Sequence, residues 1–275
     1  LTLKDPFNSA GLIIGNIQSG KTGSMEAVSC LARDNGYKVI IIISGIVGNL
    51  TSQTFDRFYS TFNEEGWLIK KTINGNINDF GNATIENTKN DIIQTLTTWH
   101  DPIWEKRPDM KKTVVIVIPK HPLHMNAVAE TFRRIHLELS HIQIPTLIID
   151  DESDQYTINV ANRRVPYETT QIIIPTDLKA VAKALNKNIE YLCNLNDLEP
   201  DDLIDEGQII ITDLPQSSNY RAIKEMKCQF PHNSSLRYTA TPQADLLSAE
   251  MDEIRPNFHG KIHSGKEYTG WKFFF

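Results

Sequence analysis

A glycine-rich segment between an apolar run and a stretch with helical spacing is the feature that most restricts the fold. It reads Gly15-Asn16-Ile17-Gln18-Ser19-Gly20-Lys21-Thr22, which fits the pattern G-x-x-x-x-G-K-[ST] at every position. The apolar run from Leu12 to Ile14 precedes it. A loop of this kind, between a strand and a helix N-terminus, surrounds phosphate groups with backbone N–H donors. The motif alone leaves open a chance glycine-rich turn.

Each part of this loop has a predicted role. Gly15 and Gly20 permit backbone angles and a close approach that a Cβ atom blocks. Lys21 is expected to reach the β- and γ-phosphates of a nucleotide, and the Thr22 hydroxyl to ligate Mg²⁺. We therefore predict ATP and Mg²⁺ as cofactors, with residues 15–22 forming the nucleotide-binding loop.

An acidic cluster follows a second apolar run, Thr146 to Ile149. Its members are Asp150, Asp151, Glu152 and Asp154. In an open parallel sheet, ligands bind at the carboxyl ends of the strands. One carboxylate there holds Mg²⁺, and an adjacent one orients and deprotonates the attacking water. We assign Asp151 to the metal and Glu152 to the water, with Lys21 and Glu152 as the catalytic residues. A helix N-terminus with acidic residues in its first turn is the alternative.

A third motif, Tyr238-Thr239-Ala240-Thr241-Pro242, again follows a short apolar segment. The hydroxyls of Thr239 and Thr241 are predicted to hydrogen-bond the acidic cluster and to transmit the nucleotide state to another surface. By itself, such a tripeptide is a weak signal.

Short β-branched runs alternate with stretches of helical spacing along the chain. The runs are Leu12–Ile14, Val39–Ile43, Val114–Ile118, Leu147–Ile149 and Leu236–Tyr238. Strands that are apolar on both faces belong in a parallel sheet covered by helices. The sequence therefore predicts an α/β fold, mostly parallel, with helices on both faces of the sheet.

The apolar spacing also predicts individual helices and one insertion. The first helix is expected to bury Met25, Val28, Leu31 and Ala32 and to end near Gly36. Further helices are predicted at 50–62, 91–99 and 123–139. Residues 162–218 fit the alternation poorly, although they contain possible strands at 172–174 and 209–211 and an amphipathic stretch at 177–185. We treat 162–218 as a segment inserted into a single domain.

Composition limits the partners and the compartment. The formal net charge of the 275 residues is −6, so the chain has no general positive field for a polyanion. The three cysteines form no Cys-x-x-Cys pair, and the apolar runs are much shorter than the roughly 20 residues that span a bilayer. We expect a cytoplasmic protein without membrane contact. Both ends of the sequence look cut from a longer chain.

Taken in order, the three motifs resemble motifs I, II and III of superfamily 2 helicases. The residues of these motifs also resemble the Z-one (Z1) domain family. Three further segments share this resemblance: Ser44-Gly45-Ile46, Asn49-Leu50-Thr51-Ser52-Gln53-Thr54 and His263-Ser264-Gly265-Lys266-Glu267-Tyr268-Thr269-Gly270. Members of that family are superfamily 2-like ATPases, often described as endonucleases, encoded near bacterial restriction-modification and defence genes. The resemblance implies a RecA-like P-loop ATPase domain, the first lobe of a DNA helicase or translocase.

The resemblance also implies roles for other residues. Gly48, Asn49 and Thr51 fall where such motors touch a nucleic-acid backbone, and a helix cap is the alternative. Lys120 falls where the family tends to carry a lysine, and a surface lysine is the alternative. No second RecA-like lobe follows, so the arginine that such a lobe contributes in trans is missing. We therefore expect this chain to bind ATP but to hydrolyse it poorly.

Several departures and alternatives stay open. Gln243 occupies a position where an aromatic residue is expected, and no convincing nuclease cluster is present. A nucleotide-gated module that binds a partner protein through the insertion is the main alternative to a motor. A P-loop kinase of small molecules is less favoured, because adjacent Asp151 and Glu152 suit the activation of water. The histidines of the pairs His121 and His124, and His259 and His263, are interpreted as structural or surface residues.

Overall fold

The computed structural model describes residues 7–15, 20–45, 48–62, 66–71, 79–80, 83–100, 111–153, 168–213, 217–242 and 256–262. The chain divides into two compact units. The first comprises Leu1–Ile158 and Ala222–Phe275, and the second comprises Asn159–Arg221. Within the described residues, no helix is both long and apolar enough to cross a membrane.

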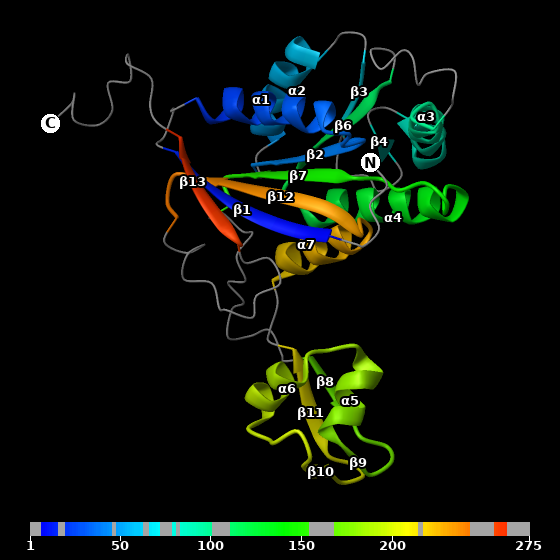
Figure 1. Ribbon diagram of the computed structural model, residues 1–275, viewed down its shortest axis with the longest axis vertical. Helices are drawn as coiled ribbons and strands as arrows, with labels where there is room; N and C mark the ends of the chain where they lie inside the picture. The colour runs from blue at the N-terminus through cyan, green and yellow to red at the C-terminus, as the bar shows by residue number, and fades with distance from the viewer. Residues whose placement is uncertain are drawn as a thin grey trace, which may run out of the picture. The chain divides into compact units, whose positions relative to one another are not determined.

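A seven-stranded sheet forms the framework of the first unit (Figure 1). Its strands are β1 (Phe7–Gly15), β2 (Val39–Ser44), β3 (Trp67–Lys71), β6 (Thr113–Pro119), β7 (Thr146–Asp151), β12 (His232–Thr239) and β13 (Phe258–Ile262). Their order is β13-β1-β12-β7-β2-β6-β3, and every pairing is parallel. This is the arrangement of a RecA-like domain, so the predicted fold class is confirmed.

Helices cover both faces of this sheet, as Figure 1 shows. They are α1 (Lys21–Asp34), α2 (Gly48–Phe62), α3 (Ile85–Thr97), α4 (Pro122–Glu138) and α7 (Ser218–Cys228). Alternate residues of the fully buried strand β2 serve different cores. Ile40 and Ile42 pack with α1 and α2, whereas Ile41 and Ile43 pack with α3, α4 and α7. Burial on both faces explains why the strand reads as a continuous apolar run.

The first helix differs from its predicted pattern at one position. Leu31 is 60% exposed, whereas Ser29 is buried and donates a hydrogen bond to the carbonyl of Met25 at 2.8 Å. At 3.6 residues per turn, Leu31 lies roughly 120° around the helix from Met25, so it cannot share the buried face. The predicted end is correct, because Gly36 has φ +86° just beyond the helix.

The other predicted helices have shifted boundaries. The helix α2 begins at Gly48 rather than at Leu50, and α4 spans Pro122–Glu138. The helix α3 begins well before the predicted Asp91, and a two-stranded ribbon precedes it, β4 (Asp79–Phe80) with β5 (Ala83–Thr84).

The second unit has its own core. Its elements are β8 (Glu168–Gln171), β9 (Thr176–Asp177), α5 (Leu178–Leu185), α6 (Ile189–Asn196), β10 (Leu203–Ile204) and β11 (Ile209–Asp213). The strands pair antiparallel, β8 with β11 and β9 with β10, around a cluster that includes Leu178, Leu192 and Ile210. The predicted strand at 172–174 is wrong: β8 ends at Gln171, and Ile173 and Ile174 are 78% and 75% exposed.

Candidate nucleotide-binding site

Three neighbouring strands bring the three motifs to one edge of the sheet. The strand β1 pairs with β12, and β12 pairs with β7, all in parallel. In this register Ile14 lies opposite Thr239, and Tyr238 lies opposite Asp151. The glycine-rich segment, the acidic cluster and the third motif therefore leave the sheet side by side at its carboxyl edge, the edge formed by the carboxyl ends of the strands.

The helix that follows the glycine-rich segment begins without a side-chain cap. Gly20 is its N-cap residue, with φ +84°, a left-handed conformation that glycine adopts readily. No side chain caps this terminus, and the first turn contains no acidic residue. Its backbone N–H groups and the helix dipole therefore suit an anion. Asn16, Ile17, Gln18 and Ser19 lie outside the described residues, so their predicted roles stay predictions.

Lys120 contacts the acidic cluster. Its side chain is 1% exposed, and this burial excludes the surface-lysine interpretation. Its Nζ lies 2.7 Å from Oδ1 of Asp150, which is also buried. It also donates to the backbone carbonyls of Asp151 and Glu152, each at 2.8 Å. An ammonium has three N–H donors, and these three contacts suffice to use all of them. Lys120 is therefore a positioning residue for the turn that carries the predicted catalytic carboxylates.

The turn itself has an uncommon backbone. Glu152 has φ +53°, a left-handed conformation that a non-glycine residue adopts at a cost of about 1–3 kcal/mol. The Asp151 carboxylate accepts a hydrogen bond from the Glu152 N–H at 3.0 Å. The Ser153 N–H donates to the Tyr238 carbonyl at 2.9 Å, which attaches the turn to β12. These bonds and the Lys120 contacts hold the strained turn in place.

The pKa of Asp151 is raised by burial and shifted by four charged groups near its carboxylate. Burial raises this pKa most, the Lys21 ammonium opposes the increase, the Glu152 and Asp150 carboxylates add to it, and Lys120 opposes it. The interaction with Lys21 connects the acidic cluster to the first turn of α1. The Asp151 carboxylate and the Thr22 hydroxyl are oxygen donors of the kind that Mg²⁺ prefers. The described residues contain no group of three or more His, Cys, Asp or Glu able to hold a metal ion. Mg²⁺ at a nucleotide site commonly needs only one or two protein ligands.

An arginine that the motifs did not reveal contacts this site. Arg57 of α2 is exposed, and its Nη1 donates a hydrogen bond to the Thr22 hydroxyl at 3.3 Å. Arg57 belongs to no recognised motif and is distant from Thr22 in the sequence. Only the packing of α1 against α2 brings the two side chains together.

The third motif contributes Tyr238, a residue to which the motif alone assigns no role. Tyr238 is fully buried, and its hydroxyl shares a hydrogen bond with the Ser24 hydroxyl of α1 at 3.3 Å. The buried Thr239 hydroxyl accepts a bond from the Thr241 N–H at 2.9 Å. Contact of the Thr239 and Thr241 hydroxyls with the acidic cluster stays a prediction. The described bonds couple β12 to α1 through Tyr238.

Thr51 has a structural environment. It is buried; its hydroxyl accepts a hydrogen bond from the Ser44 hydroxyl at 2.9 Å and donates to the Gly45 carbonyl at 3.4 Å. These bonds connect the first turn of α2 to the end of β2, so the Thr51 hydroxyl has a structural role, and its predicted contact with nucleic acid stays a prediction. Gly48 and Asn49 lie in the first turn of α2, and their predicted contact with nucleic acid stays a prediction.

The histidines at the start of α4 are structural, as interpreted from the sequence. His121 caps the helix, because its Nδ1 accepts from the Leu123 N–H at 3.3 Å. His124 is buried, and burial, helped by His121, lowers its pKa to about 4. His124 is therefore neutral at physiological pH.

No protein-family profile and no curated protein matches this chain. Among solved structures it is similar to the Hef helicase domain of Pyrococcus furiosus, with 11% sequence identity and a TM-score of 0.39 over 93% of this chain and 35% of that chain. It is also similar to FtsY from Mycoplasma mycoides, with 15% identity and a TM-score of 0.28 over 55% of this chain and 45% of that chain. The chain thus spans less than half the length of these two structures. Its parallel sheet and the position of the glycine-rich segment give it a RecA-like fold of the P-loop NTPase class.

Proposed function

We propose that this chain binds Mg-ATP at the carboxyl edge of the sheet and hydrolyses it to ADP and phosphate. The observation that carries the proposal is the parallel pairing of β1 with β12 and of β12 with β7, which places Lys21 and Asp151 at the same edge of the sheet. These residues are far apart in the sequence, and the order of β1, β12 and β7 brings them to one site. A lysine at a helix N-terminus beside a carboxylate suits a phosphate group with its metal ion.

In this proposal each residue has one task. Lys21 and the first N–H groups of α1 bind the β- and γ-phosphates, and Thr22 with Asp151 holds Mg²⁺, which neutralises charge on the phosphates. Glu152 accepts the proton of the attacking water. Lys120 fixes the backbone of the turn, so that both carboxylates keep their positions during the reaction.

Three variants of the full-length protein test this assignment. Lys21→Ala should lose ATP binding, measured by calorimetry. Glu152→Gln should keep ATP affinity and lose turnover, because the amide cannot accept the proton. Lys112→Ala changes an exposed lysine far from the motifs and should leave both properties unchanged. Wild-type turnover in Glu152→Gln would remove Glu152 from the water-activating role.

We further propose that hydrolysis drives movement along nucleic acid, as in a DNA helicase or translocase of a bacterial restriction or defence system. The order of the three motifs on a RecA-like fold supports this proposal, together with the resemblance to the Z-one family. The test is the ATPase rate of the full-length protein with and without single- and double-stranded DNA or RNA. A rate that no nucleic acid changes, while Lys21→Ala still abolishes it, would rule out the motor.

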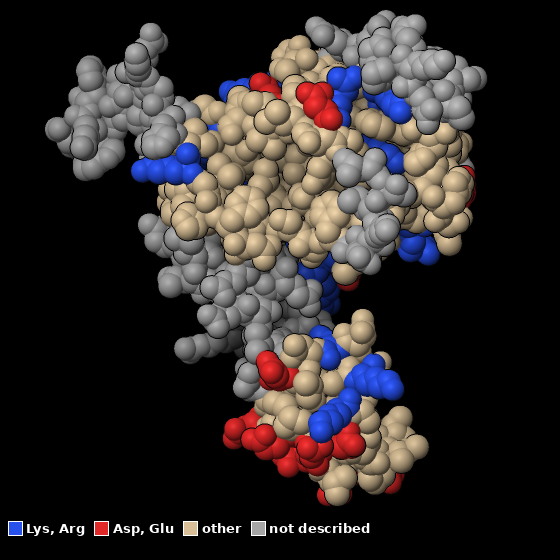
Figure 2. Space-filling view, in the orientation of Figure 1, with Lys and Arg blue, Asp and Glu red and all other residues tan. Residues whose placement is uncertain are grey.

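A nucleotide-gated interaction module is the second candidate, favoured by the surface of the Asn159–Arg221 unit. Figure 2 shows acidic side chains gathered on this unit. Leu203 and Ile209 are 83% and 62% exposed, and acidic residues lie near both of them in the sequence. Replacing residues 168–213 with a glycine-serine linker should abolish capture of a partner and spare ATP binding. If ATP binding is lost as well, the module is not separable and this candidate fails.

A further inference from the structure

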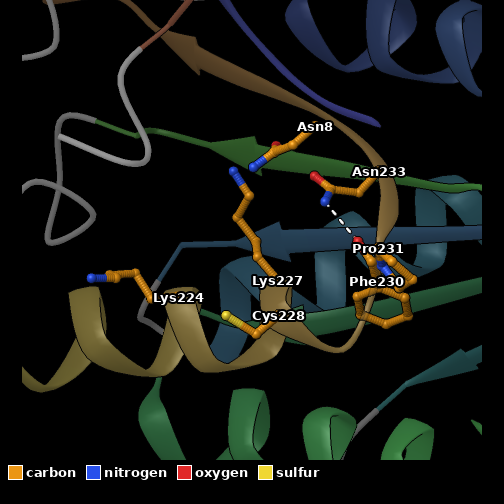
Figure 3. A pocket seen from close by; sticks show the side chains of 7 residues that line it. All are labelled: Asn8, Lys224, Lys227, Cys228, Phe230, Pro231 and Asn233. Carbon is orange, nitrogen blue, oxygen red and sulfur yellow. Dashed lines mark hydrogen bonds between the residues drawn. The ribbon is translucent and has the colours of Figure 1, made fainter. Parts of the chain in front are cut away.

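A pocket lies at the opposite edge of the same sheet, near the start of β1 and β12 and the end of α7 (Figure 3). Its volume is about 240 Å³. The lining residues are Asn8, Lys224, Lys227, Cys228, Phe230, Pro231 and Asn233. All of them belong to the first unit. None of these lining residues belongs to the motifs that the proposed nucleotide site uses.

Asn233 presents an unusual buried acceptor to this pocket. The residue is 3% exposed, and its Nδ2 donates to the Phe230 carbonyl at 2.7 Å. Only the NH₂ group can donate to a carbonyl, so this bond fixes the orientation of the amide. The buried Oδ1 then has no hydrogen-bond partner among the described residues. An unpaired buried acceptor is unfavourable, and a hydrogen-bond donor on a ligand in the pocket can satisfy it.

Two lysines line the same pocket as this acceptor. Lys227 is 8% exposed, and its Nζ donates to the Ser235 hydroxyl at 3.3 Å. Lys224 lies one helical turn earlier, and Figure 3 shows the polar ends of Asn8 and Lys227 close to one another beside Asn233. The described lining contains no acidic residue. A ligand here must therefore combine negative charge with at least one hydrogen-bond donor.

We propose that the pocket binds a singly protonated phosphate monoester of a small molecule. Such a group carries anionic oxygens, which accept from Lys227 and Lys224, and one P–OH, which donates to Oδ1 of Asn233. Sulfate has a similar size and charge but carries no proton near neutral pH, so it leaves this acceptor unpaired. A phosphate group alone fills only part of the 240 Å³, and the remaining space beside Phe230 and Pro231 accommodates the organic part of the ligand.

Cys228 provides a local probe of occupancy. It lines the pocket and is an exposed free thiol, as is Cys30 in α1, while Cys193 is a partly buried thiol of the second unit. Alkylation of each cysteine in the full chain can be followed by mass spectrometry with inorganic phosphate, methyl phosphate or sodium sulfate present. The experiment is run at about pH 6, where phosphate monoesters retain a proton in part of the population.

The proposal predicts that millimolar phosphate and methyl phosphate slow alkylation of Cys228 at least threefold and leave Cys30 and Cys193 unchanged. Sulfate at the same ionic strength should protect much less. Equal protection by sulfate overturns the assigned role of Asn233, and the absence of protection by either phosphate overturns the site.

Two variants separate this pocket from the nucleotide site. Lys21→Ala should keep the protection of Cys228, whereas Lys227→Met should remove it. Circular dichroism checks that Lys227→Met is folded; if it is not, Lys224→Met at a less buried position takes its place and should weaken protection. Protection that is lost in Lys21→Ala and kept in the folded lysine variant of α7 would place the phosphate at the nucleotide site and refute the proposal. The result does not depend on ATP hydrolysis.

Discussion

Lys120 and Asp150 form an ion pair in the interior of the first unit, with 2.7 Å between Nζ and Oδ1 and side chains that are 1% and 6% exposed. The lysine follows β6, the aspartate belongs to β7, and β2 lies between these two strands. The pair therefore bridges the carboxyl ends of two strands that are not neighbours. It fixes the position at which the acidic cluster leaves the sheet.

Lys120→Met should destabilise the protein by about 3–5 kcal/mol, because it leaves the Asp150 carboxylate buried without its cation. It also removes the donors to the Asp151 and Glu152 carbonyls. Urea unfolding followed by circular dichroism measures the change. Arg134→Met is the control: Arg134 is 46% exposed and pairs with Glu130 on the helix surface, so the loss should stay below about 1 kcal/mol. Equal effects of the two variants would contradict the structural role of Lys120.

Glu152 is predicted to lower the stability of the protein through its backbone and to support ATP hydrolysis through its carboxylate. Because Glu152 has φ +53°, Glu152→Gly should be more stable than Glu152→Ala by about 1 kcal/mol. Both variants lack the carboxylate, so both should lose ATP hydrolysis if the proposed role is right. Unfolding free energies and ATPase rates of the same preparations measure the two effects. Equal stability of the two variants would show that the left-handed turn is not maintained in solution.

The parallel sheet was predictable because its signals are local. Burial on both faces makes β2 and β6 continuous apolar runs, and the glycine-rich segment identifies the loop that follows β1. Exposed and buried positions within a helix were less predictable. The apolar spacing predicts Leu31 in the core, whereas the smaller Ser29 occupies the buried face and donates its hydroxyl to the Met25 carbonyl.

The candidate site was predictable only in part because its remaining contacts join distant segments. The sequence shows a lysine at position 120 but not whether it is buried. Its burial depends on how the residues after β6 pack against the end of β7. The contacts of Arg57 with Thr22, and of Tyr238 with Ser24, likewise arise from packing of helices and strands that no local pattern encodes.

Arg57 is predicted to oppose metal binding at the proposed nucleotide site. Its guanidinium lies 3.3 Å from the Thr22 hydroxyl, the proposed Mg²⁺ ligand. Repulsion between these cations in a solvated site amounts to about 1 kcal/mol, or roughly fivefold in affinity. Arg57→Ala should therefore lower the Mg²⁺ concentration that gives half-maximal ATP hydrolysis by roughly two- to fivefold. Arg133→Ala, on the exposed surface of α4, is the matched control and should change nothing. An increase in the required Mg²⁺ for Arg57→Ala would instead assign the guanidinium to phosphate binding.

Lys38 should make stability depend on pH in the alkaline range. The side chain is buried at the start of β2, where its Nζ contacts His100 Nε2 and the Gln143 carbonyl, both at 2.6 Å. Burial, helped by Lys111, lowers the pKa of Lys38 from 10.5 to about 8. Between these values the unfolded chain binds more protons than the folded one, so the free energy of unfolding rises with pH.

Lys38→Met removes this titration, so comparison with the wild type isolates it. Below about pH 8 both folded and unfolded Lys38 are charged, and the difference in unfolding free energy between wild type and variant should be constant. From about pH 8 to pH 10 the wild type should gain about 2 kcal/mol relative to Lys38→Met. Lys183→Met, at an exposed position of α5, should show no such gain. Urea unfolding across this pH range measures the difference. A constant difference up to pH 10 would mean that the folded protein keeps Lys38 charged.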